Sequence, residues 1–306
     1  MQILTPEDTA RALPYDKLVP AIAQAARELA SGAIDAPERM VVKAGSGGVL
    51  LCMPALGADL GVTKLITVHG GNPQHGLPAI QGEVLVFETS TGRRLALLDG
   101  PTVTARRTAA VTLLGIQTLL PGAPASALLI GTGVQAVAHA DALIAYFGVS
   151  RFRIASRDPA HAQAFCNALM RHHPQVTATA QGAQEARTEM PDTDLVIALT
   201  TSTVPVVPAR LPAGTLAAGV GAFKPEMAEL PPELLRERDI VVDDLAGAKH
   251  EAGDLLQAGI EWSRVRSLAA VLADGRPADR PLPVLKTVGQ AAWDLAAART
   301  AISSLG

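Results

Sequence analysis

The pattern of hydrophobic and polar residues divides this sequence of 306 residues into two regions. Beyond residue 124, short apolar runs alternate with stretches in which apolar residues recur at helical spacing. This alternation is typical of a doubly wound, mainly parallel sheet with helices between its strands. The strand candidates are residues 127–130, 151–156, 176–179, 194–200, 215–220 and 239–244.

The region before residue 121 has a different pattern. Its two predicted helices, residues 5–31 and 102–119, flank strand-like runs that Gly, Pro and Asn turns separate. These runs are residues 39–43, 49–54, 61–68, 84–88 and 94–98. We expect an α+β lobe with a mainly antiparallel sheet, to which an amphipathic helix over residues 288–305 can return.

The predicted fold class is therefore α/β, with two domains. A Rossmann-type doubly wound domain covers residues 121–287, and a discontinuous α+β lobe combines residues 1–120 and 288–306. The chain is long enough for each domain to bury a core of its own. The predicted hinge between them is Pro121-Gly122-Ala123-Pro124.

The turn after the first strand of the Rossmann-type region has the chemistry of a dinucleotide site. It contains a Gly-x-Gly-x-x-Ala fingerprint between a predicted strand and a predicted helix. The glycines permit a tight turn and the close approach of a pyrophosphate, and the helix N-terminus offers free N–H groups. The turn residues are Gly131, Thr132, Gly133, Val134, Gln135 and Ala136. The alternative is a glycine-rich turn that binds no ligand.

The end of the next strand indicates which dinucleotide this site suits. An NAD site usually has an acidic residue there, which hydrogen-bonds the ribose hydroxyls. Here the strand ends at Ser156 and Arg157, and Asp158 follows too late. A hydroxyl and a guanidinium suit a 2′-phosphate, so NADPH is favoured and NADH is the alternative cofactor. A structural reading leaves Arg157 solvated and Asp158 as the cap of the helix that starts at Pro159.

Composition excludes several classes of partner. The chain is 48% hydrophobic and 18% charged, and its 26 basic and 29 acidic residues give a net charge of −3, so nothing favours nucleic acid. No apolar run reaches the ~18 residues of a membrane helix, and no signal-peptide pattern opens the chain. Cys52 and Cys166 lie in separate apolar segments and predict buried thiols. We expect a cytoplasmic protein without a metal, because the seven histidines form no metal motif.

Three cations lie where the first lobe is expected to be buried or half-buried. Arg39 starts a strand, Lys64 lies in an apolar run and Arg107 lies near the start of a helix. A buried cation needs an anionic partner, because desolvating an unpaired charge is costly. The protein carboxylates that could serve are Glu38, Glu83 and Asp99. Together with a dinucleotide site, however, the three cations favour a clamp for an anionic substrate.

Six blocks along the chain form a recognisable set. They are Arg39, Gly61-x-x-Lys64, Gly71-Asn72-Pro73, Thr104-x-x-Arg107-Thr108-Ala109-Ala110, Gly131-x-Gly133-x-Gln135-Ala136 and Lys286-Thr287-Val288-Gly289. This set resembles the ornithine cyclodeaminase/μ-crystallin family over nearly the full length of the chain. The resemblance implies a homodimer, with the first lobe and the C-terminal helix forming the substrate and dimerisation lobe.

The resemblance also implies roles for individual residues. Arg39, Lys64 and Arg107 would grip a substrate carboxylate, for which a bidentate guanidinium is well suited. The segment near Gly289 would close over the nicotinamide. The residues predicted to bind the cofactor are Gly131, Thr132, Gly133, Val134, Gln135, Ala136, Ser156, Arg157, Thr200, Thr201, Val220, Gly221, Lys286 and Gly289.

One departure from the family's pattern bears on the reaction. Cyclodeaminases have a catalytic aspartate in a Gly-Gly-Asp-x-Pro-Gly-Lys-x-Glu-Leu block, and Phe223 stands at its place here. A phenyl ring cannot accept a proton or hold an ammonium group, so cyclodeamination should fail or be very slow. Reduction of a preformed C=N bond needs less, because a cyclic imine is protonated in water. Two nearby carboxylates, Glu226 and Glu229, are expected to belong to the helix that follows.

The resemblance and this departure together imply an NADPH-dependent reductase of a cyclic imino acid. The candidate reactions are Δ1-pyrroline-2-carboxylate to L-proline and Δ1-piperideine-2-carboxylate to L-pipecolate. His69 and Lys64 are the predicted catalytic residues and Met53 a predicted pocket wall, with a structural His69 and a core Met53 as alternatives. Three other functions stay open: an ammonia lyase with bound NAD, a non-catalytic NADPH-linked binding protein, and an amino-acid dehydrogenase.

Overall fold

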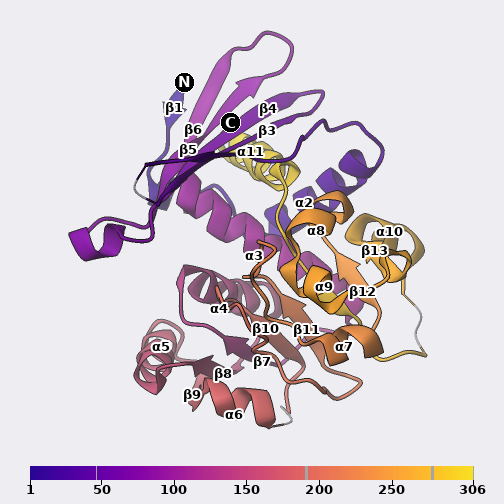
Figure 1. Cartoon of the computed structure of the whole chain (residues 1–306). Coiled ribbons are helices and arrows are strands. Elements are labelled where there is room, and N and C mark those ends of the chain that lie inside the picture. Colours follow the sequence, from indigo (N-terminus) through magenta and orange to yellow (C-terminus); the bar gives the residue numbers. More distant parts are fainter. Residues whose placement is uncertain (46, 190–191, 277–278, 306) are drawn as a thin grey trace. The chain divides into compact units, whose positions relative to one another are not determined.

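The computed structural model describes residues 1–45, 47–189, 192–276 and 279–305, and it forms two compact units (Figure 1). Unit 1 comprises Met1–Ala110 and Gln290–Gly306, and unit 2 comprises Val111–Gly289. The boundary falls inside helix α3 (Gly100–Leu119) and not at the Pro-Gly stretch after it. Residues 109–116 of this helix are all buried, so no change in burial marks the boundary between the two units.

Unit 1 is built on a sheet of six strands among the described residues, in the order β1-β6-β5-β4-β3-β2. The strands are β1 (Gln2–Ile3), β2 (Met40–Lys43), β3 (Val49–Leu56), β4 (Leu60–Val68), β5 (Ile80–Glu88) and β6 (Arg94–Asp99). All neighbours are antiparallel except β1 and β6, so the predicted mainly antiparallel sheet is confirmed. The parallel strand β1 was not predicted, because two residues are too short to show a periodic pattern.

Two helices replace the single helical stretch expected over residues 5–31. Helix α1 (Pro6–Arg11) begins with the expected capping box, in which Thr5 and Asp8 bond each other's backbone N–H groups. Helix α2 (Tyr15–Ala30) begins after Pro14, whose extended backbone separates the two helices. Proline lacks a backbone N–H and disfavours helical backbone in the residue before it, which favours a break at Pro14, whereas Pro20 is accommodated inside α2.

The C-terminal helix α11 (Ala291–Leu305) packs against α2 and against strands β3 and β4 (Figure 1). The sequence predicts an amphipathic helix here, but residues 291–298 are all buried. Most of these residues are alanines, whose small side chains allow neighbouring elements to approach the helix from every side. This central position places Asp294 in the interior of unit 1.

Unit 2 is built on a sheet of eight strands among the described residues, in the order β13-β12-β14-β11-β10-β7-β8-β9. The strands are β7 (Ser126–Ile130), β8 (Arg151–Ser156), β9 (Thr177–Gly182), β10 (Leu195–Ala198), β11 (Leu216–Gly219), β12 (Ile240–Val242), β13 (Val265–Ser267) and β14 (Val284–Lys286). All pairings are parallel, which confirms the doubly wound prediction. Strands β13 and β14, of three residues each, were not predicted.

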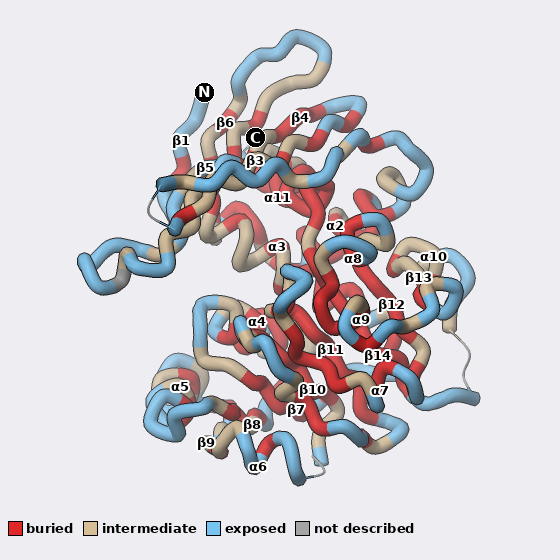
Figure 2. The backbone as a smooth tube through the Cα atoms, in the orientation of Figure 1, coloured by how far each residue is buried: buried red, intermediate tan, exposed pale blue. Residues whose placement is uncertain are grey.

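The centre of this sheet is buried on both faces. Strands β7, β10 and β11 are buried along their whole length (Figure 2), as expected when helices cover both faces of a parallel sheet. The helices are α4 (Val134–Phe147), α5 (Pro159–His172), α6 (Ala183–Thr188), α7 (Pro232–Glu237), α8 (Leu245–Glu251), α9 (Gly253–Ala258) and α10 (Leu268–Asp274). The strand order reverses between β7 and β10, where doubly wound folds bind ligands beyond the carboxyl ends of their strands. None of the helices among the described residues has the length and apolar character needed to cross a membrane.

Candidate active site

The first glycine of the fingerprint in unit 2 is required by the fold itself. Gly131 has φ +121°, and a Cβ atom there would lie 2.6 Å from the carbonyl oxygen of Leu199. Its N–H donates to the carbonyl of Ala155, at a distance of 2.8 Å. This residue therefore forms the tight turn that joins β7 to α4 and links it to β8 and β10.

The second glycine has no such requirement within the protein. Gly133 is the N-cap of α4 with φ −82°, and a Cβ atom there would meet nothing within 4 Å. No side chain caps the helix at this end, so its first N–H groups are available to a ligand. Ala136 is fully buried, as close packing of the helix requires. These features fit a pyrophosphate held against the backbone, and Gly133 is then explained by the ligand.

The first turns of α4 are held by a histidine that the sequence did not single out. His139 is buried, its Nδ1–H donates to the carbonyl of Gln135 and its Nε2 accepts from the Thr112 hydroxyl, at 2.8 and 2.9 Å. Burial lowers the pKa of His139 to about 4, so the ring is neutral. The Oε1 atom of Gln135 is buried and accepts no hydrogen bond from the described residues.

The strand end expected to choose the dinucleotide lies beside this turn. Ile130 pairs with Ala155, so Ser156 and Arg157 follow directly at the carboxyl ends of the strands. Ser156 is half-buried and Arg157 is exposed. The Asp158 side chain accepts from Ala160 N–H at 2.9 Å and caps α5, as the structural reading anticipated. Its carboxylate is thus committed to the helix.

Four further predicted cofactor residues, Thr200, Thr201, Val220 and Gly221, follow the carboxyl ends of the neighbouring strands β10 and β11. Ala198 of β10 pairs with Ile130 of β7 and with Gly219 of β11, and Gly219 pairs with Lys286 of β14. The loops that begin at Thr200 and Gly221 therefore leave the sheet side by side. Thr201, the next residue, is exposed, whereas Val220 is buried in its strand end.

A fully buried carboxylate, Glu229, joins these two loops. Its Oε1 atom accepts from the N–H and hydroxyl of Thr200, and its Oε2 atom accepts from the N–H groups of Gly221 and Ala222, at 2.7 and 3.0 Å. The expectation that Glu226 and Glu229 belong to a following helix is wrong, because the next helix starts at Pro232. Burial raises the pKa of the Glu229 carboxyl, while the charge of Lys286 and the Thr200 N–H lower it.

Two predicted cofactor residues at the end of β14 are engaged by the protein. Lys286 is 0% exposed, and its Nζ forms an ion pair with Asp254 at 2.8 Å, so its ammonium group is not presented to a ligand. Gly289 has φ +85°, and its N–H donates to Asp243 at 3.0 Å. Asp243 also accepts from Val288, at 2.9 Å. These residues shape the segment near Gly289 through their protein contacts.

Phe223, the residue at the position of the cyclodeaminase aspartate, lies directly after the Glu229-bound loop residues. It is half-buried, and Lys224 Nζ lies 5.9 Å from the centre of its ring. The only chemistry this side chain offers is apolar contact and attraction of a cation to its face. It supplies no acid or base.

In unit 1, two of the predicted clamp cations meet at one carboxylate. Lys64 on β4 lies 2.8 Å from Asp294 Oδ2, and Arg107 Nε on α3 lies 3.2 Å from Asp294 Oδ1. Met53 pairs with Lys64 in the adjacent strand, so both face α11 from the same side of the sheet. The partner that the structure shows for these cations is Asp294, and not one of the acidic residues suggested by the sequence. Met53 itself is 3% exposed, which also suits a core residue.

The surroundings make Lys64 easier to deprotonate than a free lysine. Burial lowers its pKa to about 8, with Asp294 opposing the shift and the charges of Arg107 and Arg39 adding to it. Arg39, the third predicted clamp cation, is half-buried and lies just before β2. Two buried cations share one carboxylate, which leaves a positive environment suited to an anionic group.

His69, the other predicted catalytic residue, is not brought to this cluster. Side chains alternate between the faces of a strand, and His69 lies five residues beyond Lys64. Its N–H donates to the carbonyl of Ala79 at 2.8 Å, which continues the β4–β5 ladder and places the His69 side chain on the opposite face. A Cβ atom on Gly48 would lie 2.3 Å from the His69 ring, so the ring packs closely on that glycine. The geometry favours the structural alternative for His69.

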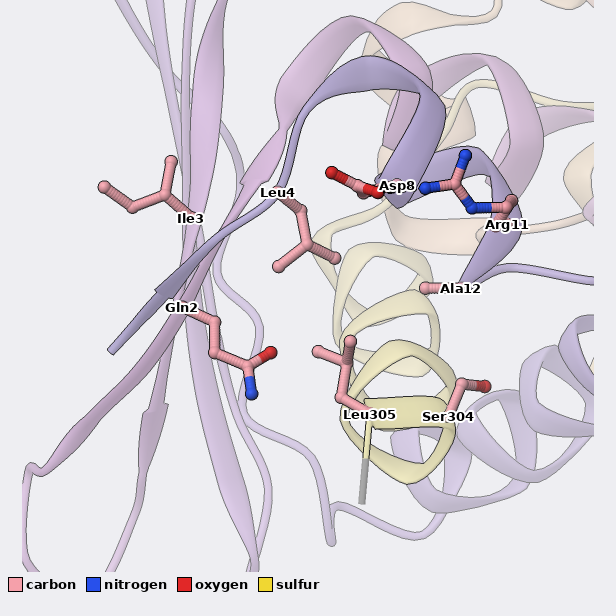
Figure 3. Close-up of a pocket in the computed structure, with 8 residues that line it drawn as sticks. All are labelled: Gln2, Ile3, Leu4, Asp8, Arg11, Ala12, Ser304 and Leu305. Atoms are coloured by element: carbon pink, nitrogen blue, oxygen red, sulfur yellow. Dashed lines mark hydrogen bonds and ion pairs between the residues drawn. The ribbon is translucent and has the colours of Figure 1, made fainter.

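Three remaining features involve residues that were not predicted to form the site. A cavity of about 530 Å³ in unit 1 opens between Leu4, Ala12 and Leu305, beside the Asp8–Arg11 ion pair (Figure 3). Cys166 is buried as expected, whereas Cys52 is half-buried, and both are free thiols. Among the described residues, no group of three or more His, Cys, Asp and Glu side chains is arranged to hold a metal ion.

The fold and these residues define the class of protein: a Rossmann-type α/β unit with a dinucleotide fingerprint, combined with an antiparallel-sheet unit that contains a buried cation cluster. The chain belongs to the ornithine cyclodeaminase/mu-crystallin family, whose model matches residues 1–304. The resemblance expected from the sequence is thereby confirmed.

Individual relatives are similar over almost the whole chain. A Δ1-pyrroline-2-carboxylate/Δ1-piperideine-2-carboxylate reductase of Azospirillum brasilense is 47% identical, over 97% of this chain and 94% of the relative. Among solved structures, Thermococcus litoralis Δ1-pyrroline-2-carboxylate reductase in complex with NADH and L-proline has a TM-score of 0.88 and 25% identity, over 99% and 97% of the two chains. An archaeal alanine dehydrogenase dimer with bound NAD has a TM-score of 0.88 and 28% identity, over 99% and 95%.

Proposed function

We propose that this chain is an NADPH-dependent reductase of cyclic imine carboxylates, acting on Δ1-pyrroline-2-carboxylate, Δ1-piperideine-2-carboxylate or both. It is an oxidoreductase that acts on a C=N bond, as the names of its bacterial relatives indicate. The ligands in the Thermococcus litoralis complex, NADH and L-proline, are a reductant and a product of this kind of reaction. The products here are L-proline and L-pipecolate.

The observation that carries the proposal is the pair of buried cations that share Asp294. A lone carboxylate cannot neutralise both Lys64 and Arg107, so the cluster gains stability when a second carboxylate arrives. The substrate supplies that group, and the planar guanidinium of Arg107 is suited to orient it. Arg39 adds to the positive charge felt at Lys64. Binding would thereby fix the imine ring relative to the protein.

Reduction of the imine adds a hydride at C2 and a proton at nitrogen. A bound nicotinamide cofactor supplies the hydride. Lys64 is the better candidate to supply or maintain the proton, because its pKa of about 8 leaves it charged at neutral pH and able to donate. His69 lies on the other face of the sheet and is not needed for this step.

The residues of unit 2 that would hold the cofactor are those of its carboxyl edge. The N-terminus of α4 with Gly133 suits the pyrophosphate, and Ser156 with Arg157 suits a 2′-phosphate. NADPH is the proposed cofactor on the strength of this strand end, although the two solved relatives contain NADH and NAD. Phe223 supports a reductase over an ammonia lyase, because it offers no base for amine oxidation.

The test is NADPH consumption with each cyclic imine, run beside NADH and beside a Lys64→Met variant. Lys64→Met should lower kcat by about 100-fold or more if Lys64 is the proton donor, whereas the exposed Lys17→Met is the matched control and should leave kcat unchanged. Turnover with NADH alone would keep the reaction and overturn the NADPH assignment. Binding without turnover, or release of ammonia from ornithine without NADPH, would refute the proposal.

We also propose that the protein is a homodimer that buries the outer face of the unit 1 sheet. Met40, Cys52 and Leu65 lie in register on the face opposite to Lys64, and Met40 and Leu65 are 61% and 47% exposed. Such an apolar face on a folded protein favours association. Light scattering should give twice the monomer mass, and Leu65→Glu should give monomers. A monomeric wild-type protein would contradict this assignment.

A further inference from the structure

Glu229 occupies a place where the parallel sheet of unit 2 would otherwise leave backbone donors unpaired. The ladder continues one step beyond the strand ends, through Leu199 N–H to Ile130 and Val220 N–H to Ala198. The next N–H after each of these two strands, at Thr200 and at Gly221, donates to the Glu229 carboxylate instead. The Glu229 carboxylate thus pairs the backbone N–H groups that follow both strands, and both of its oxygen atoms act as acceptors.

The two loops are held closer than ordinary side chains would allow. A Cβ atom on Gly221 would lie 1.9 Å from the carbonyl oxygen of Thr200 and 2.7 Å from Glu229 Oε1. Glycine at this position is therefore required by the contact between the loops, and Glu229 closes that contact. Any loss of the carboxylate would free three backbone N–H groups and allow the loops to separate.

Glu229 is itself fixed by a second buried carboxylate. Asp254 Oδ1 accepts from the N–H groups of Glu229 and Leu230, and Asp254 Oδ2 lies 2.8 Å from Lys286 Nζ. Lys286 also donates to the carbonyl of Ala222, next to Gly221. The contacts form a closed circuit from the loop through Glu229 and Asp254 to Lys286 and back. Buried networks of this kind restrict motion when every member has a partner.

We propose that Glu229 is a positioning residue for the dinucleotide, with Asp254 and Lys286 as its support. It holds the loops after β10 and β11 in the form that accepts the nicotinamide half of the cofactor, and it need not touch the cofactor. The inference rests on the proposed use of a nicotinamide dinucleotide. Lys286, which the sequence predicts as a cofactor-binding residue, then acts through its contacts with Asp254 and Ala222 and not as a direct ligand of the cofactor. The loops lie at the reversal of strand order, where such ligands bind.

The test is the dissociation constant of NADPH, measured by fluorescence titration on the whole protein without imine. Glu229→Gln keeps the shape but points an amide NH₂ group toward N–H donors, and it should weaken NADPH binding by about tenfold or more. At saturating NADPH, the KM for the imine should stay within about twofold, because the clamp in unit 1 is untouched. Asp254→Asn should weaken NADPH binding in the same direction but less, since Glu229 remains.

A matched control separates positioning from general stability. Asp194 also accepts hydrogen bonds from backbone N–H groups, those of Ala125 and Ser126 at 2.8 and 2.9 Å, but at the amino ends of the strands of the same sheet. Asp194→Asn should lower the Tm and leave NADPH affinity unchanged. Equal losses of affinity in Asp194→Asn and Glu229→Gln, or none in Glu229→Gln, would overturn the inference.

The outcomes also separate this inference from the proposed function. If the wild-type protein binds NADPH without reducing either imine, the proposed reaction fails and the positioning role can still be measured. If Glu229→Gln does not fold, Asp254→Asn decides, and unchanged NADPH affinity in that variant overturns the inference. A wild-type protein that binds neither NADPH nor NADH would overturn both.

Discussion

Replacing Asp294 by asparagine is the sharpest test of the cation cluster in unit 1. The substitution keeps the side-chain shape and removes one negative charge. That charge lies 2.8 Å from Lys64 Nζ and 3.2 Å from Arg107 Nε, and Asp294 is 0% exposed. The variant therefore leaves two buried cations without the carboxylate they share, and we expect it to be destabilised.

The magnitude depends on pH because Lys64 can give up its proton. Its pKa of about 8 lies below the ordinary 10.5, and without Asp294 it falls further, since the Asp294 charge raises it. Below pH 8, the variant loses an ion pair that the wild type has, or discharges Lys64. Discharge at pH 6, two units below the wild-type pKa, costs at most about 2.7 kcal/mol. Above pH 8, Lys64 is neutral in both proteins and this part of the penalty disappears.

The assay is chemical denaturation of the wild type and Asp294→Asn at pH 6 and pH 9, at equal protein concentration. The loss in free energy of unfolding should be larger at pH 6, by up to about 2.7 kcal/mol. The share that comes from Arg107 should be the same at both pH values, because arginine stays protonated. A loss that is equal at the two pH values, or larger at pH 9, would refute the coupling of Lys64 to Asp294.

Three further substitutions test the remaining assignments. Gly133→Ala should leave the Tm unchanged but weaken NADPH binding by about tenfold or more, because only a ligand would occupy the space of the added methyl group. Gly131→Ala should instead lower the Tm, since φ is +121° there. Equal losses of Tm in the two variants would contradict this difference between the two glycines. Arg157→Ala should shift the kcat/KM ratio toward NADH by about tenfold through loss of the phosphate contact, and an unchanged ratio would show that Arg157 is only solvated. Arg107→Ala should raise the KM for the imine by about 10- to 100-fold, and steady-state kinetics with an unchanged KM would remove it from the clamp.

Local features of this chain could be predicted from its sequence, because their physical causes act between residues that are close along the chain. The fingerprint at Gly131 and Gly133 depends on one strand, one turn and one helix, all within consecutive residues. The buried positions of Lys64 and Arg107 could be inferred from their apolar neighbours. The face on which His69 lies was also available from the sequence, because its separation from Lys64 by five positions already placed the two on opposite sides of a strand.

Charge partners could not be predicted in the same way. Lys64 and Asp294 are 230 positions apart, and the sequence offered nearer carboxylates that were equally reasonable. Asp254 lies in helix α9 and Lys286 at the end of strand β14, so this ion pair likewise joins residues that are distant along the chain. The sequence predicts Glu229 in a helix, because a sequence pattern does not show that a side chain turns inward to accept hydrogen bonds from backbone N–H groups.

The sequence by itself determined the fold class, the family and the residue types of the site, because apolar periodicity and short motifs depend on neighbours along the chain. Only the tertiary structure decided which charges meet. It gave Lys64 and Arg107 one shared carboxylate, and it gave Lys286 to Asp254 instead of to a ligand. The physical reason is that a charge in a core must be paired at hydrogen-bond distance, and its partner is chosen by how helices and strands pack.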